Sequence, residues 1–287
     1  MAAEGTALLA SISFALFAVY GWLGLRQSTP VAGTIISLAA RTVTLGAAVV
    51  ITGGIPPYAR AALAIFVFLG LLQSSISLLT FVGLGKIGTA RSQPLRNSYP
   101  LWSSGIAIAF LGEEASLGVL AGTLLVVVGV VLISWKPEAA APSYRWWYVL
   151  YSLAAGFLAG LAFPLRRYGL TITNAPVFFS FVVAIVSLLG SLPYILWRRS
   201  DAAIVWNRRG LMHFAASGFF EAMGALLTLV ALTRARVVIV SPIVATTPLF
   251  SLIISLIFFR GKEQVTGRTI IGTVAVVAGT IAITLGK

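Results

Sequence analysis

Long apolar runs of about 20 residues dominate this chain, and only short polar segments separate them. A helix needs about 20 mostly apolar residues to cross the hydrocarbon core of a bilayer. We count ten such runs: 6–25, 31–52, 61–84, 87–111, 116–135, 146–168, 175–197, 211–233, 237–259 and 266–285. They predict an all-α membrane protein with ten transmembrane helices.

The composition supports this class and excludes others. Hydrophobic residues make up 59% of the chain and charged residues 9%, whereas soluble domains carry about a quarter charged residues. The net charge of +13 is spread over loops and helix ends, which fits lipid headgroups and membrane orientation better than nucleic acid. There is no cysteine, one histidine and no cluster of carboxylates, so we expect neither a metal site nor a cofactor.

One segment matches the consensus of a nucleotide-binding motif but lacks the surrounding elements that such a motif needs. Gly83–Gly88 reads G-x-G-x-x-G, and a dinucleotide fingerprint would need a strand before it and a βαβ unit around it. Here it joins two apolar runs, so we interpret it as a tight turn between membrane helices.

The stretch Ser92–Trp102 is unusual because it places polar residues and two prolines inside an apolar run. Ser241–Phe250 repeats its pattern 148 positions later: Pro94 matches Pro242, and Pro100 matches Pro248. Buried polar groups at membrane depth must face protein or water. Each half of the chain is therefore predicted to contain one proline-broken, partly polar helix.

The repeat extends over both halves, which we place at residues 1–136 and 144–287. At the same offset, Gly70 matches Gly218, and the segment 78–80 matches 226–228. Each half holds five predicted helices, an odd number, so the second half must enter the membrane from the opposite side. Inverted repeats around a central cavity are typical of secondary transporters, with the substrate near the midplane.

The proline-broken helix, the following Leu111-Gly112-Glu113-Glu114 and the glycine-punctuated helix after it resemble the EamA unit of the drug/metabolite transporter superfamily. Arg41 in the second helix also suits that unit. The resemblance covers nearly the whole chain, although the second half has Arg260-Gly261-Lys262-Glu263 where the family would have Leu-Gly-Glu.

This resemblance implies a central cavity between helices 1–4 and 6–9, with helices 5 and 10 at the periphery. It implies a multi-pass protein of a bacterial-type inner membrane that exports amino acids or other small metabolites, and the aromatic amino-acid exporters are the nearest match. A lipid or lipid-carrier flippase on the same scaffold is the alternative. We expect a monomer. We also expect no enzymatic activity, because the sequence shows no nucleophile–base pair.

Candidate site residues lie on the fourth helix and its neighbours. Ser92, Arg96, Tyr99 and Ser103 share one face at helical spacing. We interpret the serines as helix-packing residues and Arg96 and Tyr99 as cavity residues, because a mid-membrane arginine needs water or a partner. Thr247 is the counterpart of Tyr99 in the second repeat.

Glu221 is the one acidic residue predicted in the middle of a membrane helix, and its counterpart in the first repeat is Gln73. A carboxyl group that gains and loses a proton in the cavity would make protons the coupling ion. Alternatively, Glu221 stays ionised and pairs with an arginine, or it binds a substrate amine. Arg41 is interpreted as a tether between helices.

Several aromatic residues are predicted at mid-membrane depth, where they either line a pocket for a flat apolar group or face lipid: Phe14, Tyr99, Trp102, Phe157 and Phe163. The predicted substrate-binding set is Gln73, Arg96, Tyr99, Trp102, Phe163, Glu221 and Thr247.

Two criteria predict opposite membrane orientations. The loops on one side hold 11 Lys and Arg residues, and the loops and terminus on the other hold 6, with Arg166, Arg167, Arg234 and Arg236 among the latter. The positive-inside rule then puts both termini outside, whereas the family resemblance implies both inside. We favour the charge count.

Overall fold

The structure is a computed structural model that describes residues 3–87, 89–134, 145–198, 207–258 and 266–286. The described residues form helices and connecting segments, without strands. The helices are α1 (Ala3–Leu25), α2 (Pro30–Ile51), α3 (Arg60–Ile87), α4 (Thr89–Arg96), α5 (Tyr99–Leu111), α6 (Leu117–Ser134), the short 3₁₀ helix η1 (Trp146–Tyr148), α7 (Val149–Ile172), α8 (Pro176–Arg198), α9 (Arg208–Arg234), α10 (Val237–Val244), α11 (Thr247–Phe258) and α12 (Gly267–Leu285).

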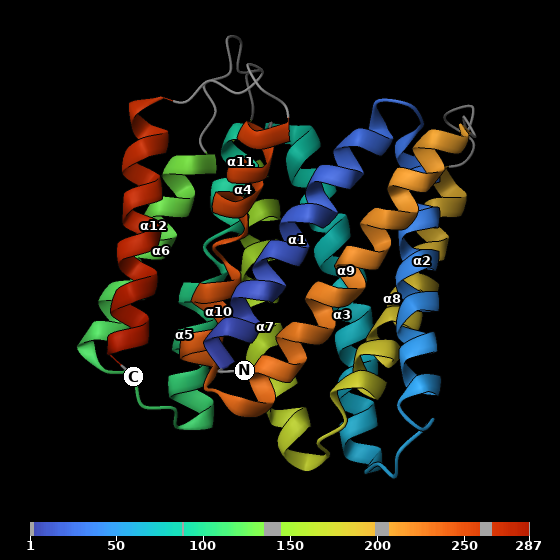
Figure 1. Ribbon diagram of the computed structural model, residues 1–287, viewed down its shortest axis with the longest axis horizontal. Coiled ribbons are helices and arrows are strands. Elements are labelled where there is room, and N and C mark those ends of the chain that lie inside the picture. Colours follow the sequence, from blue (N-terminus) through green and yellow to red (C-terminus); the bar gives the residue numbers. More distant parts are fainter. Residues whose placement is uncertain (1–2, 88, 135–144, 199–206, 259–265, 287) are drawn as a thin grey trace.

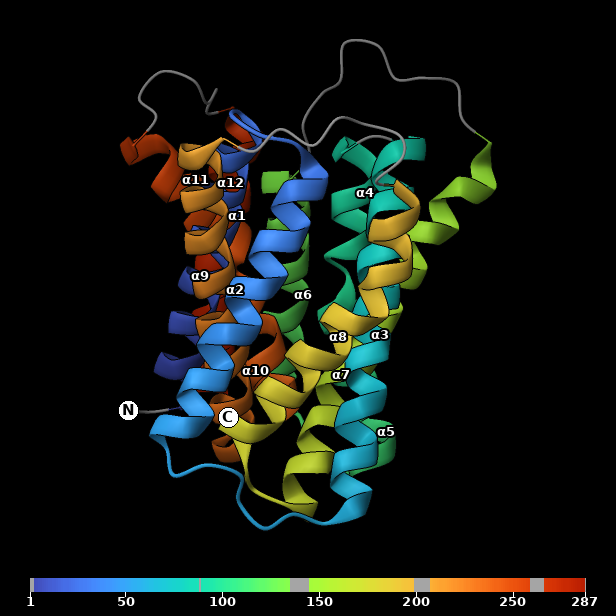
Figure 2. The ribbon, with the colours of Figure 1, turned by 90° about the vertical axis from the view of Figure 1, so that its right-hand side faces the viewer.

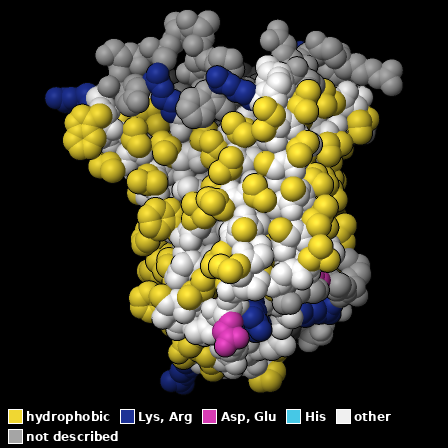
Figure 3. All heavy atoms as spheres, turned by 90° about the vertical axis from the view of Figure 1, so that its left-hand side faces the viewer, with side chains coloured by type: hydrophobic (Ala, Val, Ile, Leu, Met, Phe, Trp, Pro, Cys, Tyr) yellow, Lys and Arg dark blue, Asp and Glu magenta, His cyan; other side chains and the backbone are white. Residues whose placement is uncertain are grey.

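The surface is that of a membrane protein. Nine helical segments of the described chain are long and apolar enough to cross a bilayer. Figure 3 shows a band of hydrophobic side chains between two ends where lysine and arginine gather. The predicted fourth run is not among the nine, although the equally divided α10–α11 segment is, because α4 is polar and carries Arg91 and Arg96. Ten membrane-spanning helices therefore remain a prediction.

Two helices are broken where the repeated prolines predict it. One break, at Asn97 and Ser98, separates α4 from α5, and the other, at Ala245 and Thr246, separates α10 from α11. Proline has no N–H to donate to the carbonyl four residues earlier, and its ring crowds that carbonyl. Pro100 and Pro248 stand just after these breaks, so the chain reorients there and then resumes a helix (Figures 1 and 2).

The interpretation of Gly83–Gly88 as a turn was wrong for residues 83–87, because α3 continues as a helix to Ile87, and Gly88 lies outside the described residues. The glycine has a packing role instead. A Cβ atom at Gly83 would collide with the Ser152 Oγ on α7. Small residues of this kind allow membrane helices to approach closely.

The two halves of the chain are interleaved. The first-half helices α1 and α2 pack against α9, and α3 packs against α7 and α8. In Figures 1 and 2, α1 begins at the lower end of the bundle and α7 begins at the upper end. This is the direction expected of inverted repeats, whose superposition remains a prediction.

The α6–α12 pair forms one edge of the bundle (Figure 1) and is held by glycine-to-backbone contact. A Cβ atom at Gly122 would lie 2.6 Å from the Gly279 carbonyl oxygen, and one at Gly129 would lie 2.6 Å from the Gly272 oxygen. Helix association in membranes depends on close packing of this kind, since lipid provides no hydrophobic driving force between helices.

Candidate functional site

A cavity of about 770 Å³ lies between the two halves of the chain. Eight pairs of its lining residues stand 148 positions apart: Phe14 and Ala162, Ala18 and Arg166, Gln73 and Glu221, Ser77 and Ala225, Thr80 and Thr228, Arg96 and Val244, Asn97 and Ala245, and Tyr99 and Thr247. Both halves therefore contribute equivalent positions to much of the lining. The chemistry of the two members often differs, so the polar and charged groups are distributed asymmetrically within a lining that is otherwise apolar.

The structure brings most of the predicted site residues to this cavity. Six of them line it, namely Gln73, Arg96, Tyr99, Phe163, Glu221 and Thr247. Trp102 does not. Its side chain is 39% exposed, and its ring packs edge-on against Phe157, itself 41% exposed. Trp102 therefore lies outside the cavity, on a part of α5 that is turned outward.

Arg41 and Glu221 form an ion pair across the cavity wall. The Arg41 Nη1 donates to the Glu221 Oε1 at 2.9 Å, and the side chains are 4% and 16% exposed. Arg41 comes from α2 and Glu221 from α9, so the pair links the two halves. A buried charge is costly unless it is paired, and this contact supplies a partner to each of the two groups.

Two further arginines line the cavity without a carboxylate partner in the described part of the chain, namely Arg96 and Arg166. The Arg166 Nη2 has a marginal contact of 3.5 Å with the Gln73 Oε1. The Nε atoms of Arg96 and Arg166 are both buried and have no hydrogen-bond partner among the described residues. Both guanidinium groups are thus incompletely hydrogen-bonded, and both side chains line the cavity.

Arg166 was missed as a candidate, because the sequence interpretation counted it with the basic residues near a helix end. It lies within α7, six residues before that helix ends at Ile172. The repeat contains the signal that would have found it. At the offset of 148, Arg166 matches Ala18, which lies well inside α1.

An aromatic wall stands beside the arginines. Tyr99 and Phe163 stack with ring centroids 5.5 Å apart and an interplanar angle of 11°. The Arg166 guanidinium carbon lies 5.6 Å from the centre of the Phe163 ring. Phe14 and Phe17 of α1 also line the cavity. A flat apolar group and an anionic group could therefore bind next to one another.

The serines of the fourth helix pack helix against helix. The hydroxyl groups of Ser92 and Ser152 are 2.8 Å apart, and those of Ser103 and Ser241 are 2.5 Å apart. All four side chains are buried, and none lines the cavity. The stripe that the sequence shows as one face is therefore divided at the break between α4 and α5.

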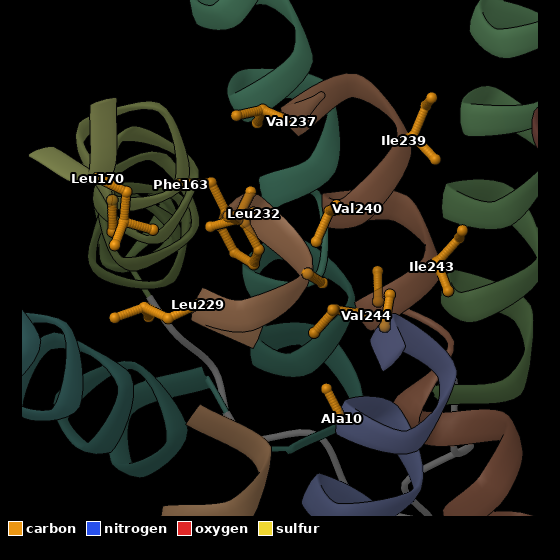
Figure 4. Packing of buried hydrophobic residues seen from close by; sticks show 14 of the residues in the cluster. Ala10, Phe163, Leu170, Leu229, Leu232, Val237, Ile239, Val240, Ile243 and Val244 are labelled. Carbon is orange, nitrogen blue, oxygen red and sulfur yellow. The ribbon is translucent and has the colours of Figure 1, made fainter. Parts of the chain in front are cut away.

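The cavity is closed toward the end of the bundle where α1 begins. Its lining extends the other way, to Ser134 at the opposite end of α6. Below the cavity, buried residues of α7, α9 and α10 form an apolar cluster that includes Leu170, Leu232 and Val240 (Figure 4). The Arg167 guanidinium donates to the Leu232 carbonyl oxygen and fastens α7 to α9 there.

Glu113 strengthens this closed end. Its two carboxylate oxygens accept hydrogen bonds from the main-chain N–H groups of Val237 and Val238, at 2.9 and 3.1 Å. These are unsatisfied donors at the N-terminus of α10, where a negative charge is favoured. Gly112, at a φ of +63°, ends α5 and turns the chain toward this contact.

The matching segment of the second repeat, Gly261-Lys262-Glu263, lies outside the described residues. The first-repeat motif thus has a structural explanation of its own, as a contact between the halves.

Together, the apolar helices and the central cavity define a multi-pass membrane protein. The profile of the EamA-like transporter family matches residues 1–135 and again residues 146–285. The chain belongs to this family, and two copies of the family unit account for nearly all of it.

The comparison with solved structures agrees on the fold. A protein of known crystal structure superposes on 99% of this chain and 96% of its own length, with a TM-score of 0.82 and 16% sequence identity. At that identity the likeness shows the fold alone. No curated protein sequence matches this chain.

Proposed function

We propose that this protein is a secondary transporter of a bacterial-type inner membrane that exports small amphipathic metabolites, amino acids and their aromatic members among them. The observation that carries this proposal is the cavity itself, which both halves line at equivalent positions. Transporters with inverted repeats place their substrate site between the repeats and expose it to one side at a time.

The described state fits one step of such a cycle. The cavity extends toward Ser134, while Glu113, Arg167 and the apolar cluster close the other end. In the proposed cycle, these closing contacts break as a second set forms at the opposite end, and the ten-helix scaffold rocks around the substrate.

The cavity lining favours a water-soluble solute over a lipid. Glutamine, asparagine, serine and threonine side chains line it together with the charged groups. A flippase would instead need an apolar path that opens sideways to the bilayer. The volume of about 770 Å³ lies within the range of small-molecule sites.

Transport can be tested in cells and with purified protein. Overexpression should raise resistance to some members of a panel of toxic amino-acid and metabolite analogues. The matched control is Arg96→Ala, which should lose the resistance at equal expression. If no analogue distinguishes the expressing strain from the empty strain, and liposomes containing the protein also move none of them, the proposed function is wrong.

A further inference from the structure

We propose that the cavity binds small organic anions, a carboxylate or phosphate group attached to a flat apolar body, in preference to zwitterionic or cationic solutes. This inference rests on the proposed transport function and narrows its substrate class. It also adds Arg166 to Arg96 as a binding residue.

The first observation is the charge of the lining. Four permanently or normally charged groups line the cavity, namely Arg41, Arg96, Arg166 and Glu221. The one carboxylate is bound to Arg41 at 2.9 Å. Two positive charges therefore remain without a counter-charge from the described residues. Uncompensated charge at membrane depth is costly, so a bound anion would be strongly favoured there.

The second observation is that the Arg96 and Arg166 guanidinium groups belong to the cavity lining and are incompletely hydrogen-bonded. A guanidinium group carries five N–H donors, in an arrangement that matches carboxylate and phosphate oxygens. The buried Nε atoms of Arg96 and Arg166 have no partner in the described chain. Tyr99, which also lines the cavity, interacts electrostatically with both arginines.

The third observation is that the carboxylate of the lining is already paired with an arginine. A substrate ammonium group would need a carboxylate or several free oxygens near the arginines. Glu221 is engaged with Arg41, and the Gln73 Oε1 faces the Arg166 guanidinium. An α-amino group would meet the field of two cations. The stacked rings of Tyr99 and Phe163, in contrast, offer a surface to a phenyl-sized body.

A series of ligands that share one phenyl ring tests the charge preference on the unaltered protein. The ligands are 3-phenylpropionate (anion), phenylalanine (zwitterion), phenethylamine (cation) and phenyl phosphate. Affinity is measured by calorimetry in nanodiscs of neutral lipid. We expect at least one of the two anions to bind about tenfold or more tightly than phenylalanine, and phenethylamine not to bind.

Variants of Arg96 and Arg166 then test whether these two residues bind the anion. Arg96→Gln and Arg166→Gln should each weaken anion binding by about tenfold or more. The matched control is Arg26→Gln, an exposed arginine whose guanidinium lies over Trp22 at 5.1 Å, outside the cavity. It should bind as the parent does. Anion affinity that is unchanged in both folded cavity variants would overturn the assignment, and if either fails to fold, the ligand series on the parent protein decides.

The two proposals fail in different ways. Equal or tighter binding of phenylalanine, or no binding of either anion, overturns the anion inference even when the protein transports other solutes. If the anions bind as expected but liposomes containing the protein move neither the anions nor any solute of the analogue panel, the anion-binding inference stands and the transport function does not.

Discussion

Replacing Glu221 by glutamine removes the partner of a nearly inaccessible arginine. Arg41 is 4% exposed, and its one ion pair in the described chain is the 2.9 Å contact with Glu221. Breaking a buried ion pair by removing one partner costs about 3–5 kcal/mol, because the remaining charge is uncompensated. Glu221 is 16% exposed and lines the cavity, where water can reach it, so we expect the lower end, about 3 kcal/mol.

Thermal unfolding measures this cost. The chain has 7 tryptophans for fluorescence. A loss of about 3 kcal/mol should lower the midpoint by roughly 6–12 °C, on a scale of about 2–4 °C per kcal/mol. Arg41→Met with Glu221→Gln removes both charges and should be more stable than the sum of the single changes predicts, by about 0.5–3 kcal/mol. Glu114→Gln, at an exposed acid outside the cavity, is the matched control.

Glu221→Gln also distinguishes between two roles of the Glu221 carboxyl group, a structural ion pair with Arg41 and proton coupling of transport. We expect Glu221→Gln to lose stability but to keep the response of transport to a collapsed pH gradient. A midpoint within about 2 °C of the parent, or additive effects of the two changes, would refute the ion-pair reasoning. A stable variant that no longer responds to the pH gradient would assign the carboxyl group to coupling instead.

Three further predictions concern the scaffold. Glu113→Gln should cost about 1 kcal/mol in thermal unfolding, because a charged acceptor at the start of α10 is lost. Glu114→Gln should cost nothing, since Arg236 donates to the main-chain oxygen of Glu114, which the change leaves in place. Gly122→Leu should destabilise by about 1–3 kcal/mol through collision with Gly279, while Gly105→Ala, with open space around it, should not. If the Lys and Arg count sets the membrane orientation, the C-terminus lies outside, and a C-terminal reporter that is active only outside the cytoplasm should be active. Activity of a C-terminal reporter that works only in the cytoplasm would contradict this orientation.

Much of this fold can be predicted from the sequence because the bilayer imposes simple requirements. Length and hydropathy place most helices within a few residues, and proline chemistry places the two breaks. Helical spacing places Ser92, Arg96, Tyr99 and Ser103 on one face, but spacing alone cannot show that the helix breaks within this group. The break between Arg96 and Tyr99 keeps these two at the cavity and turns Ser92 and Ser103 into packing positions.

The partners of charged residues were harder to predict. Arg41 and Glu221 are 180 positions apart, and nothing local in the sequence pairs them. Arg166 was counted as a loop-end charge, although its repeat counterpart lies inside a helix. Glu113 belongs to a motif whose meaning is clear only when α10 is placed against it. In each case the missing information is a contact between the two halves of the chain.

Side-specific modification of a cavity cysteine tests most directly whether solutes pass through this cavity. The chain has no cysteine of its own, so Ser77→Cys provides a single thiol on the lining, and Trp102→Cys provides one outside it. A bulky, membrane-impermeant thiol reagent applied to each face of oriented liposomes should block transport of a solute from the screen in Ser77→Cys alone, and faster from one face. Full modification of Ser77→Cys with transport unchanged would contradict the account.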